Sequence, residues 1–545
     1  MISDEYLFSN IGIDSIGFHA PRYYVDIEDL AARRNVDPAK FRDGLMLKEM
    51  RLAEKDEDII SLGLKAGYNA LSRGNISPKD IDAVFCGTET ITYAVKSVSN
   101  IFAHMLGISD NCMTQDIYNA CAGGTLAILN AIGLLENDII KKALVISADI
   151  SSYQIGSASE ATQGSGAVAM VLSKNPRIAT FGKRFGKISG NVNDFFRTAK
   201  EKDAKVFGHY SVDSFLSFQL GAYDDLVKQI GDFSADFYFF HAPFSKLPLK
   251  AMQHIILKRW AKHINNSLSL KRHKGHSLKS SIVRRIDHLL HDAAVLPEYI
   301  YLKLKEKGFS SEKLEEWAYT INTNLKGKVF PQLRVPMHFG NMYNAAVWAQ
   351  IVYILENYAR VNDTLYFGSY GSGATCISGL LKVKPQFKRI MRKGPKIDDF
   401  IRFKERKTID EYEDIKNCCA QLNPRLGKIS EHELNDHRGF MLHFCDEGCI
   451  IPNIKGVNYC PKGHSGFHER FFPLFAVLDS NPINNTDLNN GYLAKGYVRV
   501  VGDVERGTSL EYEIRRVVCS EEGEDPATAG LLNWAPIYIA VQNIY

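Results

Sequence analysis

Short apolar stretches alternate with segments of helical periodicity along the first third of the chain. In residues 56–74 the apolar positions recur at intervals of three and four and stop at Gly74, which predicts an amphipathic helix. Four β-rich runs lie in this part of the chain, at residues 11–21, 83–90, 142–151 and 166–176. Strands that alternate with helices in this order predict a buried mixed or parallel sheet with covering helices.

The same layout recurs further along the chain. Residues 236–260 predict a strand, a turn and a helix, residues 341–363 a long apolar helix, and residues 364–383 a strand hairpin punctuated by glycine. Each half therefore holds a strand-turn-helix element, although the sequence shows no clean repeat. The pattern predicts a duplicated α/β fold.

Changes of composition divide the chain into four predicted units. The two halves of the duplicated fold are expected at residues 1–175 and 176–383, and a charged helical connector at residues 384–437. Residues 438–545 contain several short β-rich runs. Such runs predict a small antiparallel domain at the C-terminal end of the chain, in the form of a barrel.

The composition is that of an ordinary globular protein. The chain has 545 residues, of which 45% are hydrophobic and 23% charged, and its net charge of +4 is too small to indicate nucleic acid or a membrane as partner. The N-terminus has neither the basic nor the apolar region of a signal peptide, and no apolar run reaches the length of a membrane span. We therefore expect a cytoplasmic protein whose ten cysteines are reduced thiols, metal ligands or nucleophiles.

One segment departs from this even charge distribution. Residues 250–285 contain ten Lys or Arg and no Asp or Glu. A solvated basic loop explains the pattern, and so does a landing surface for an anionic cofactor arm or an acidic carrier protein. The sequence leaves both interpretations open.

Cys121 lies between a predicted strand and an apolar helix, with Gly123 and Gly124 close behind it. A cysteine in an apolar run is usually inert core. At a strand-to-helix turn, however, the helix dipole and the free N–H groups favour a thiolate. The glycines would let a thioester approach the backbone, so the window predicts a nucleophile.

Other windows supply complementary groups. Glu89 follows a short strand, and His241 follows the aromatic run at residues 237–240. A glycine-rich turn at residues 368–374 lacks the pattern of a phosphate-binding loop but offers its backbone to a ligand. The candidates for contacting the substrate or an oxyanion are Asn341, Tyr343, Gly371 and Ser372.

Together, these windows resemble the 3-hydroxy-3-methylglutaryl-CoA synthase family of the thiolase superfamily, in the family's order. The matching segments span about residues 10–383. They read "GIDSIGFHAPRYYVDIEDLAARRNVDPAKF", "GTET", "NACAGGT", "EATQGSGAVAM", "FHAPFSKLPLKAM", "GNMYNAAVW" and "SYGSGA". The resemblance implies a duplicated thiolase-type fold layered α-β-α-β-α, a homodimer, and CoA thioesters as substrates.

The resemblance also implies roles for the candidate residues. Cys121 would accept an acetyl group from acetyl-CoA or an acyl-carrier thioester, Glu89 would act as general acid and base, and His241 would polarise the acceptor's carbonyl. The acceptor would be a 3-oxoacyl thioester such as acetoacetyl-CoA, and water would release the product. Such a reaction needs no catalytic metal, nicotinamide or flavin. Lys246 and Lys250 are predicted to lie near the phosphates of CoA or a carrier's phosphopantetheine arm.

Two other functions stay open at this point. A ketoacyl synthase III-like acyltransferase or Claisen condenser uses a Cys–His–Asn set, and Asn341 could complete it. A scaffold with an inactive thiolase fold could instead bind a partner through the C-terminal domain. Glu89 favours the first function, because it should be essential there and dispensable in a ketoacyl synthase.

The C-terminal region holds a candidate zinc site with the spacing C-x3-C-x10-C-x3-H. Two pairs of soft ligands on turns suit a tetrahedral structural zinc, although unpaired cysteines near a loop explain them too. Together with the strand pattern, the site resembles the zinc-ribbon and OB-like domains that accompany thiolase-fold enzymes. That likeness implies acyl-CoA binding or a bridge to a thiolase, and no nucleic acid. The predicted ligands are Cys445, Cys449, Cys460 and His464, with His443 and His468 as alternatives.

Overall fold

The computed structural model describes residues 7–54, 57–198, 201, 203–256 and 325–421, and short strands between residues 440 and 541. The first half of the fold contains the predicted alternation of strands and helices. Its strands are β1 (Phe8–His19), β4 (Ala83–Gly87), β5 (Met113–Ile117), β6 (Lys142–Ile150) and β7 (Ser165–Lys174). Its helices are α4 (Ile59–Gly74), η1 (Pro78–Asp80), α5 (Val98–Met105), α6 (Gly123–Glu136) and η2 (Glu160–Thr162).

The helix predicted over residues 56–74 is α4. It begins after Asp58, whose carboxylate accepts hydrogen bonds from the backbone N–H groups of Ile60 and Ser61. It ends before Asn75, which adopts the left-handed conformation that terminates helices. Both ends therefore follow from local capping chemistry.

The second half contains the predicted hairpin and long helix. Its strands are β8 (Ala179–Gly182), β9 (Gly186–Ser189), β10 (Phe195–Phe196), β11 (Lys205–Val206), β12 (Phe237–Phe240), β13 (Thr364–Gly371) and β14 (Thr375–Val383). Its helices are α7 (Gly208–Ile230), η3 (Leu325–Val329), η4 (Pro331–Leu333), α12 (Arg334–Phe339), η5 (Tyr343–Ala345) and α13 (Ala346–Asn357). The predicted helix over residues 341–363 is shorter, because Tyr343 has a φ of 41° and a separate turn precedes α13.

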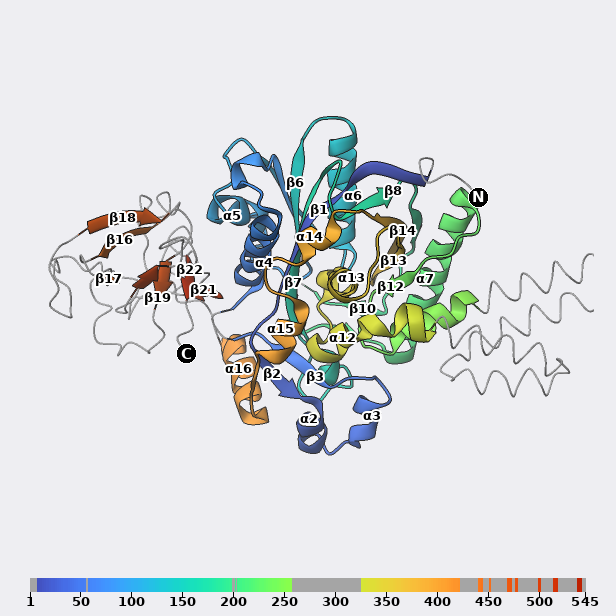
Figure 1. The fold of residues 1–545 in the computed structure, drawn as a ribbon. Coiled ribbons are helices and arrows are strands. Elements are labelled where there is room, and N and C mark those ends of the chain that lie inside the picture. Colours follow the sequence, from blue (N-terminus) through green and yellow to red (C-terminus); the bar gives the residue numbers. More distant parts are fainter. Residues whose placement is uncertain are drawn as a thin grey trace, which may run out of the picture.

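A ten-stranded mixed sheet runs through both halves, as Figure 1 shows. Its strand order is β12-β13-β14-β8-β1-β7-β6-β4-β5, and β9 pairs with β14. Strand β8 pairs antiparallel with both β1 and β14, so it joins the two halves. The parallel pairs β4–β5, β4–β6 and β12–β13 place the carboxyl ends of these strands at common edges.

Three of the hydrophobic cores lie among five layers of structure, and the middle core packs against the central helices from both sides. Helices α6 and α13 pack in the middle, on Val145 of β6 and Phe367 of β13. The neighbouring Ile146 faces the opposite way, into the core under α4 and α5, and Tyr366 faces the core under α7. Figure 1 shows the same order, with α4 and α5 on one side, α6 and α13 central, and α7 on the other side. The predicted α-β-α-β-α layering of a thiolase-type fold is confirmed.

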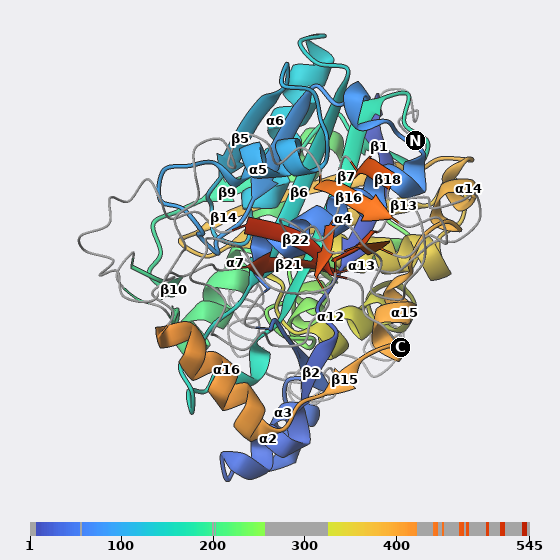
Figure 2. The ribbon, with the colours of Figure 1, turned by 90° about the vertical axis from the view of Figure 1, so that its left-hand side faces the viewer.

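A smaller subdomain packs beside the layers. It contains the sheet β15-β2-β3 and the helices α2 and α3, and α16 runs beside α2 in Figures 1 and 2. The described part of the predicted connector, residues 384–421, contains the helices α14, α15 and α16. The bounds are β2 (Tyr23–Asp26), α2 (Ile27–Arg33), α3 (Pro38–Arg42), β3 (Glu49–Leu52), α14 (Phe387–Met391), α15 (Ile397–Arg402), β15 (Glu405–Arg406) and α16 (Ile409–Gln421).

The C-terminal strands pair antiparallel in three groups, β17-β16-β18, β19-β20 and β21-β22. Their bounds are β16 (Phe440–Phe444), β17 (Ile450–Ile451), β18 (His468–Phe472), β19 (Ala476–Leu478), β20 (Val498–Val500), β21 (Glu513–Val517) and β22 (Ile537–Val541). These strands agree with the predicted β-rich character of the region.

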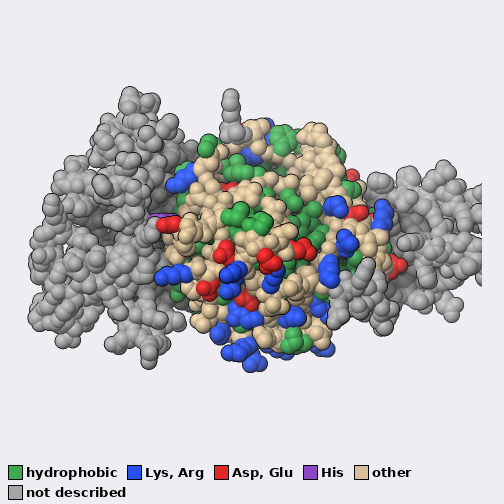
Figure 3. Space-filling view, turned by 90° about the horizontal axis from the view of Figure 1, so that it is seen from above, with side chains coloured by type: hydrophobic (Ala, Val, Ile, Leu, Met, Phe, Trp, Pro, Cys, Tyr) green, Lys and Arg blue, Asp and Glu red, His purple; other side chains and the backbone are tan. Residues whose placement is uncertain are grey.

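Acidic and basic side chains are interspersed on the face seen from above in Figure 3, around a group of hydrophobic side chains. This mixture matches the small net charge of the chain. Within the described ranges, no helix combines the length and the apolar character that a membrane crossing requires.

Candidate active site

Cys121 lies at the turn between β5 and α6, where three chain segments come close together. A Cβ atom on Gly87, at the end of β4, would lie 2.1 Å from the Gly124 nitrogen. A Cβ atom on Gly371, at the end of β13, would lie 2.4 Å from the Asn119 carbonyl oxygen. Only glycine allows such close approach. The predicted turn residue Gly371 therefore lets the second half of the fold close over the nucleophile loop.

Cys121 and Glu89 form the central pair of the site. The Cys121 thiol donates a hydrogen bond to Glu89 Oε1 at 3.0 Å. The pKa of Glu89 is raised to about 8, mainly by burial and in addition by the nearby Asp149 carboxylate. A carboxylate with a pKa near neutrality is both a usable base and a usable acid at physiological pH.

The expected stabilisation of a thiolate by the helix N-terminus is wrong for this resting state. Burial raises the pKa of the Cys121 thiol well above its ordinary value, and the neighbouring Glu89 adds to this effect. The helix dipole supplies only a fraction of a charge at one terminus, whereas the thiol is buried beside a carboxylate. The resting pair is thus a thiol and its hydrogen-bond acceptor, so the carboxylate must remove the proton.

Asp149, at the end of β6, fixes the loop that holds Glu89. Its Oδ1 accepts hydrogen bonds from the Glu89 N–H at 2.9 Å, the Thr88 hydroxyl at 2.9 Å and the Thr90 N–H at 3.1 Å. The side chain is fully buried. Burial raises the pKa of Asp149, and the hydrogen bonds from Asn344 oppose the rise. These contacts orient Glu89 toward the thiol.

Asn344 connects Asp149 to the nucleophile loop. Its Nδ2 donates to Asp149 Oδ2 and to the Ala120 carbonyl oxygen, each at 2.9 Å. Its Oδ1 accepts the Gly124 N–H at 2.7 Å. Ala120 and Gly124 flank Cys121, so one buried amide links the loops of both members of the central pair.

An aromatic wall lies beside the thiol. Cys121, Tyr153 and Tyr343 form one buried cluster, with Phe195 packed against it. The Tyr153 and Tyr343 rings meet edge to face, with centroids 6.4 Å apart. Asn341 Nδ2 donates to the Tyr153 hydroxyl at 3.4 Å. Of the predicted substrate-contacting residues, Tyr343 thus lies in this cluster and Asn341 is hydrogen-bonded to it.

His241 lies at the end of β12, which pairs in parallel with β13. It follows β12 directly, and its backbone N–H donates to the Gly368 carbonyl oxygen of β13 at 2.9 Å. Gly371 at the end of the same strand contacts the nucleophile loop. The His241 side chain is buried, and its Nδ1 has no hydrogen-bond partner among the described residues. Burial lowers the pKa of His241 to about 3, so the imidazole is neutral at pH 7.

Three of the predicted residues, Ser372, Lys246 and Lys250, have surroundings other than the Cys121–Glu89 pair. The Ser372 hydroxyl donates to Asp194 Oδ2 at 3.3 Å. Lys246 Nζ donates to the Asp43 carbonyl oxygen at 3.2 Å. Lys250 is partly buried, and burial together with the charge of Lys246 lowers its pKa. These contacts keep Ser372 near the site, whereas they hold Lys246 against the loop that follows α3.

Several site residues were missed by sequence reasoning. Asp149 had a visible signal, since it is a lone carboxylate inside the apolar run at residues 142–151. Arg197 had none, yet its Nη2 donates to the Glu89 carbonyl oxygen at 2.7 Å. Tyr153 and Asn344 resemble ordinary core and helix-start residues in the sequence. Their contacts depend on segments far apart along the chain.

The four predicted zinc ligands lie outside the described residues. The alternatives His443 and His468 lie in the paired strands β16 and β18, where the register sets His443 opposite Glu469. Within the described ranges, no group of His, Cys, Asp and Glu is arranged to hold a metal ion.

A layered, duplicated α/β fold with a buried Cys–Glu pair at a strand-to-helix turn is that of the thiolase-type, acyl-transferring condensing enzymes. Comparisons with known proteins identify the family. The N-terminal part of hydroxymethylglutaryl-coenzyme A synthase matches residues 8–176, and the C-terminal part matches residues 191–414. The chain therefore belongs to the hydroxymethylglutaryl-CoA synthase family and is a condensing enzyme of this type.

Curated relatives bear the same name. The hydroxymethylglutaryl-CoA synthase of Enterococcus faecalis is 32% identical over 244 residues, which cover 44% of this chain and 63% of that enzyme. The synthase of Gibberella zeae is 27% identical over 443 residues, or 76% of this chain and 87% of that enzyme. The fungal match extends the likeness over most of both proteins.

Solved structures share the fold. MvaS in complex with 3-hydroxy-3-methylglutaryl coenzyme A is 26% identical, with a TM-score of 0.63 over 75% of this chain and 92% of that one. The HMG synthase of the curacin biosynthetic pathway, solved with an acetyl donor-ACP, is 22% identical, with a TM-score of 0.62 over 77% and 92% of the two chains. The second likeness concerns the fold alone.

Proposed function

We propose that this protein forms a 3-hydroxy-3-methylglutaryl thioester from an acetyl thioester and a 3-oxoacyl thioester, with Cys121, Glu89 and His241 as catalytic residues. The observation that supports these roles best is the 3.0 Å hydrogen bond from the Cys121 thiol to Glu89. This contact places a nucleophile beside its base in a buried site. The neutral, buried His241 is the proposed third member of the set.

The first step is acetyl transfer to Cys121. Glu89 takes the thiol proton as sulfur attacks the thioester carbon, and the tetrahedral intermediate expels the donor's thiolate. The same carboxylic acid then returns its proton to the departing sulfur. One thioester bond forms and one breaks, so the step is nearly balanced in energy. The backbone N–H groups at the start of α6 and the turn at Gly371 and Ser372 are the proposed oxyanion contacts.

The second step forms the new carbon–carbon bond. Glu89, now a carboxylate again, removes a proton from the acetyl methyl group, and the resulting enolate attacks the ketone of the 3-oxoacyl thioester. Burial keeps the pKa of Glu89 near 8, which makes it a stronger base than an exposed carboxylate. Asn341 and Tyr343 are proposed to hold the acetyl group while this proton moves.

His241 acts on the acceptor. Its pKa of about 3 keeps the imidazole neutral, so it donates an N–H to the acceptor's carbonyl oxygen rather than transferring a proton. The alkoxide that forms therefore takes its proton from the Glu89 carboxylic acid. Water then hydrolyses the thioester at Cys121 and frees the thiol.

The donor is proposed to be acetyl-CoA, with an acyl-carrier thioester as the alternative source of the same acetyl group. The proposal is supported by the CoA ligands of two related structures, whereas the curacin pathway synthase was solved with a carrier protein. Lys246 and Lys250 are the proposed contacts for the phosphates of either arm. The basic segment at residues 250–285 is the proposed docking surface for an acidic carrier, and its residues 257–285 lie outside the described part of the chain.

Intact-protein mass spectrometry with acetyl-CoA tests the proposal. Wild type and Glu89→Gln are compared with Cys121→Ala after mixing, with acetylated carrier protein as a second donor. One acetyl group is expected on wild type and none on Cys121→Ala. Glu89→Gln lacks the base, so it should acquire the acetyl group slowly over a long incubation. On adding acetoacetyl-CoA the wild-type adduct should disappear, whereas the Glu89→Gln adduct should persist. Wild-type protein that acetylates from neither donor would favour a scaffold. Condensation that persists in Glu89→Gln would favour a ketoacyl synthase III-like enzyme.

We further propose that the protein is a homodimer assembled through β5. This strand lies at the end of the sheet order and pairs with β4 alone among the described strands, and Met113 and Tyr118 are about half exposed there. Light scattering should show a dimer for wild type and for the control Val361→Lys. Met113→Lys should favour the monomer, and an unchanged dimer would refute the assignment of this edge.

The remaining predictions concern organisation. We propose units at residues 1–175, 176–383, 384–437 and 438–545, with a zinc-ribbon and OB-like fold in the last and a cytoplasmic location. Zinc bound to Cys445, Cys449, Cys460 and His464 is tested by elemental analysis of wild type beside Cys445→Ser. One equivalent of zinc that the variant loses is the expected result.

A further inference from the structure

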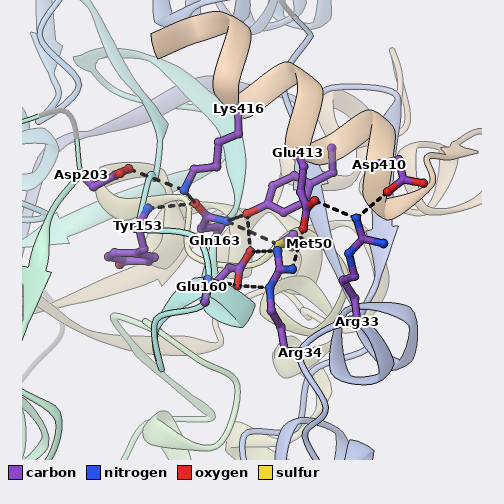
Figure 4. A network of polar contacts seen from close by, with 12 residues as sticks. Arg33, Arg34, Met50, Tyr153, Glu160, Gln163, Asp203, Asp410, Glu413 and Lys416 are labelled. Carbon is purple, nitrogen blue, oxygen red and sulfur yellow. Dashed lines mark hydrogen bonds and ion pairs between the residues drawn. The ribbon is translucent and has the colours of Figure 1, made fainter.

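Helix α16 makes a buried polar contact with the loop between β6 and β7. Figure 4 shows Lys416 and its neighbours pointing from this helix toward Gln163. Lys416 Nζ donates to Gln163 Oε1 at 2.6 Å, and Gln163 Nε2 donates to the Tyr412 hydroxyl at 2.7 Å. Both ends of the Gln163 amide are therefore held by one helix.

Gln163 in turn holds Tyr153. Its Oε1 accepts the Tyr153 backbone N–H at 2.8 Å, in addition to the bond from Lys416. The Tyr153 ring lies in the buried cluster with Cys121 and Tyr343. Two hydrogen bonds thus separate the Lys416 ammonium from the backbone of the residue that covers the nucleophile.

The same helix fixes the loop at a second point. The Tyr412 hydroxyl donates to Glu160 Oε1 at 3.0 Å. Glu160 also forms a bidentate pair with Arg34, at 2.8 Å for each contact, and Arg34 reaches Glu413 of α16 at 2.5 Å. Two-point attachment through charge-assisted bonds leaves the loop little freedom to shift.

The chemistry of these contacts indicates that they fix the orientation of the Gln163 amide. Lys416 is only 9% exposed, and its ammonium lies 3.6 Å from Asp203 Oδ1. A buried charge is costly, and apolar packing would join a helix to a loop at least as stably. Hydrogen bonds differ from apolar packing in that they fix orientation, and here they fix the amide that aligns Tyr153.

We propose that α16 is a positioning element of the active site, in which Tyr412 and Lys416 orient Gln163, and Gln163 holds Tyr153 against Cys121. The inference rests on the proposed role of Cys121 as the nucleophile. Tyr412, Lys416 and Gln163 are positioning residues that act through Tyr153. Loss of any of them should loosen the wall beside the thiol.

The test compares Lys416→Met and Gln163→Leu with wild type, using the full chain. Lys388→Met, an exposed lysine on α14, is the matched control, and Lys416→Arg tests rescue by retained donors. Two rate constants at Cys121 are measured by mass spectrometry: alkylation by iodoacetamide, which needs no substrate, and acetylation by acetyl-CoA. The amplitude of acetylation and the melting temperature report the folded fraction separately.

Alkylation should become about 3- to 10-fold faster in Lys416→Met and Gln163→Leu, because the thiol is only 6% exposed behind Tyr153. The acetylation rate constant should fall about 5- to 50-fold at nearly full amplitude, because the thiol is misplaced rather than lost. Lys416→Arg should recover most of both rates. A double variant should be no worse than either single variant, since one chain of contacts is broken in each.

Rate constants within twofold of wild type, with only a lower melting temperature or amplitude, would overturn the inference and leave α16 as packing. Wild-type protein that is not acetylated would defeat the proposed function instead. The alkylation comparison still decides the role of α16 in that case, so the two failures are distinguishable.

Discussion

Replacing Asn344 by alanine tests how the nucleophile loop is held. The wild-type amide bonds the Gly124 N–H at 2.7 Å, and the Ala120 carbonyl oxygen and Asp149 Oδ2 at 2.9 Å each. Alanine removes all three contacts, although the backbone N–H of residue 344 still donates to Asp149 at 3.0 Å. The substitution therefore detaches both flanks of Cys121 from the carboxylate that holds the Glu89 loop.

The expected magnitude follows from burial. A buried polar group that loses its hydrogen-bond partner costs about 1–3 kcal/mol. A water molecule in the vacated space would bond some of the three groups that the amide leaves behind. We expect the free energy of unfolding to fall by about 2–4 kcal/mol. A displacement of the thiol by about 1 Å costs about 100-fold in rate, so the acetylation rate constant of Cys121 should fall about 10- to 100-fold.

Rapid-quench intact-mass measurements at saturating acetyl-CoA give this rate constant, and urea titration gives the stability. Asn357→Ala is the control, because among the described residues that amide bonds only the Tyr353 carbonyl oxygen, at 3.1 Å, on the exposed end of α13. Its rate and stability should stay close to wild type. If Asn344→Ala acetylates within twofold of wild type at unchanged stability, the amide does not position the nucleophile.

Three further outcomes follow from the same geometry. Because the Glu89 carboxylate is the reactive form and its pKa is about 8, the acetylation rate at low acetyl-CoA should rise about tenfold per unit below pH 8 and level off above it; a flat profile would contradict this. His241→Ala should leave acetylation of Cys121 intact but slow condensation about 100-fold or more, measured by product formation from acetoacetyl-CoA; equal loss of both steps would contradict it. Arg73→Met should lower the free energy of unfolding by about 3–5 kcal/mol, because it removes the 3.0 Å partner of the fully buried Glu356 carboxylate; urea unfolding close to wild type would refute this account.

The sequence predicted the helices and strands because these depend on local periodicity, whereas the layering was implied by the family resemblance. The helix over residues 56–74 matches α4 closely, since its caps lie in the sequence beside the apolar pattern. The start of α13 was misplaced because Tyr343 adopts a left-handed backbone that no local pattern signals. Cys121 and Glu89 were found through motifs, and their contact spans 32 positions of the chain.

The residues that hold the pair were missed for a physical reason. Asp149 and Asn344 lie 195 positions apart. Asp149 stands out locally as a lone carboxylate in an apolar run, but nothing in the sequence beside it points to Asn344 as its partner. Their importance arises only when the duplicated halves close on each other and bury both side chains. A polar pair buried in this way must satisfy its own hydrogen bonds, and here it does so by binding the two catalytic loops.

The same closure explains why the predicted thiolate is wrong. Sequence reasoning compared the helix terminus with free solvent, where even a partial positive charge favours the anion. In the folded protein the second half covers the turn, so burial opposes the anion and the adjacent Glu89 carboxylate opposes it further. Burial raises the pKa of both groups, so the proton stays on the sulfur at rest. The 3.0 Å hydrogen bond gives this proton a direct path to Glu89 as the thioester arrives. A site that must take a proton, return it and take another from carbon is served better by such a pair than by a permanently ionised thiol.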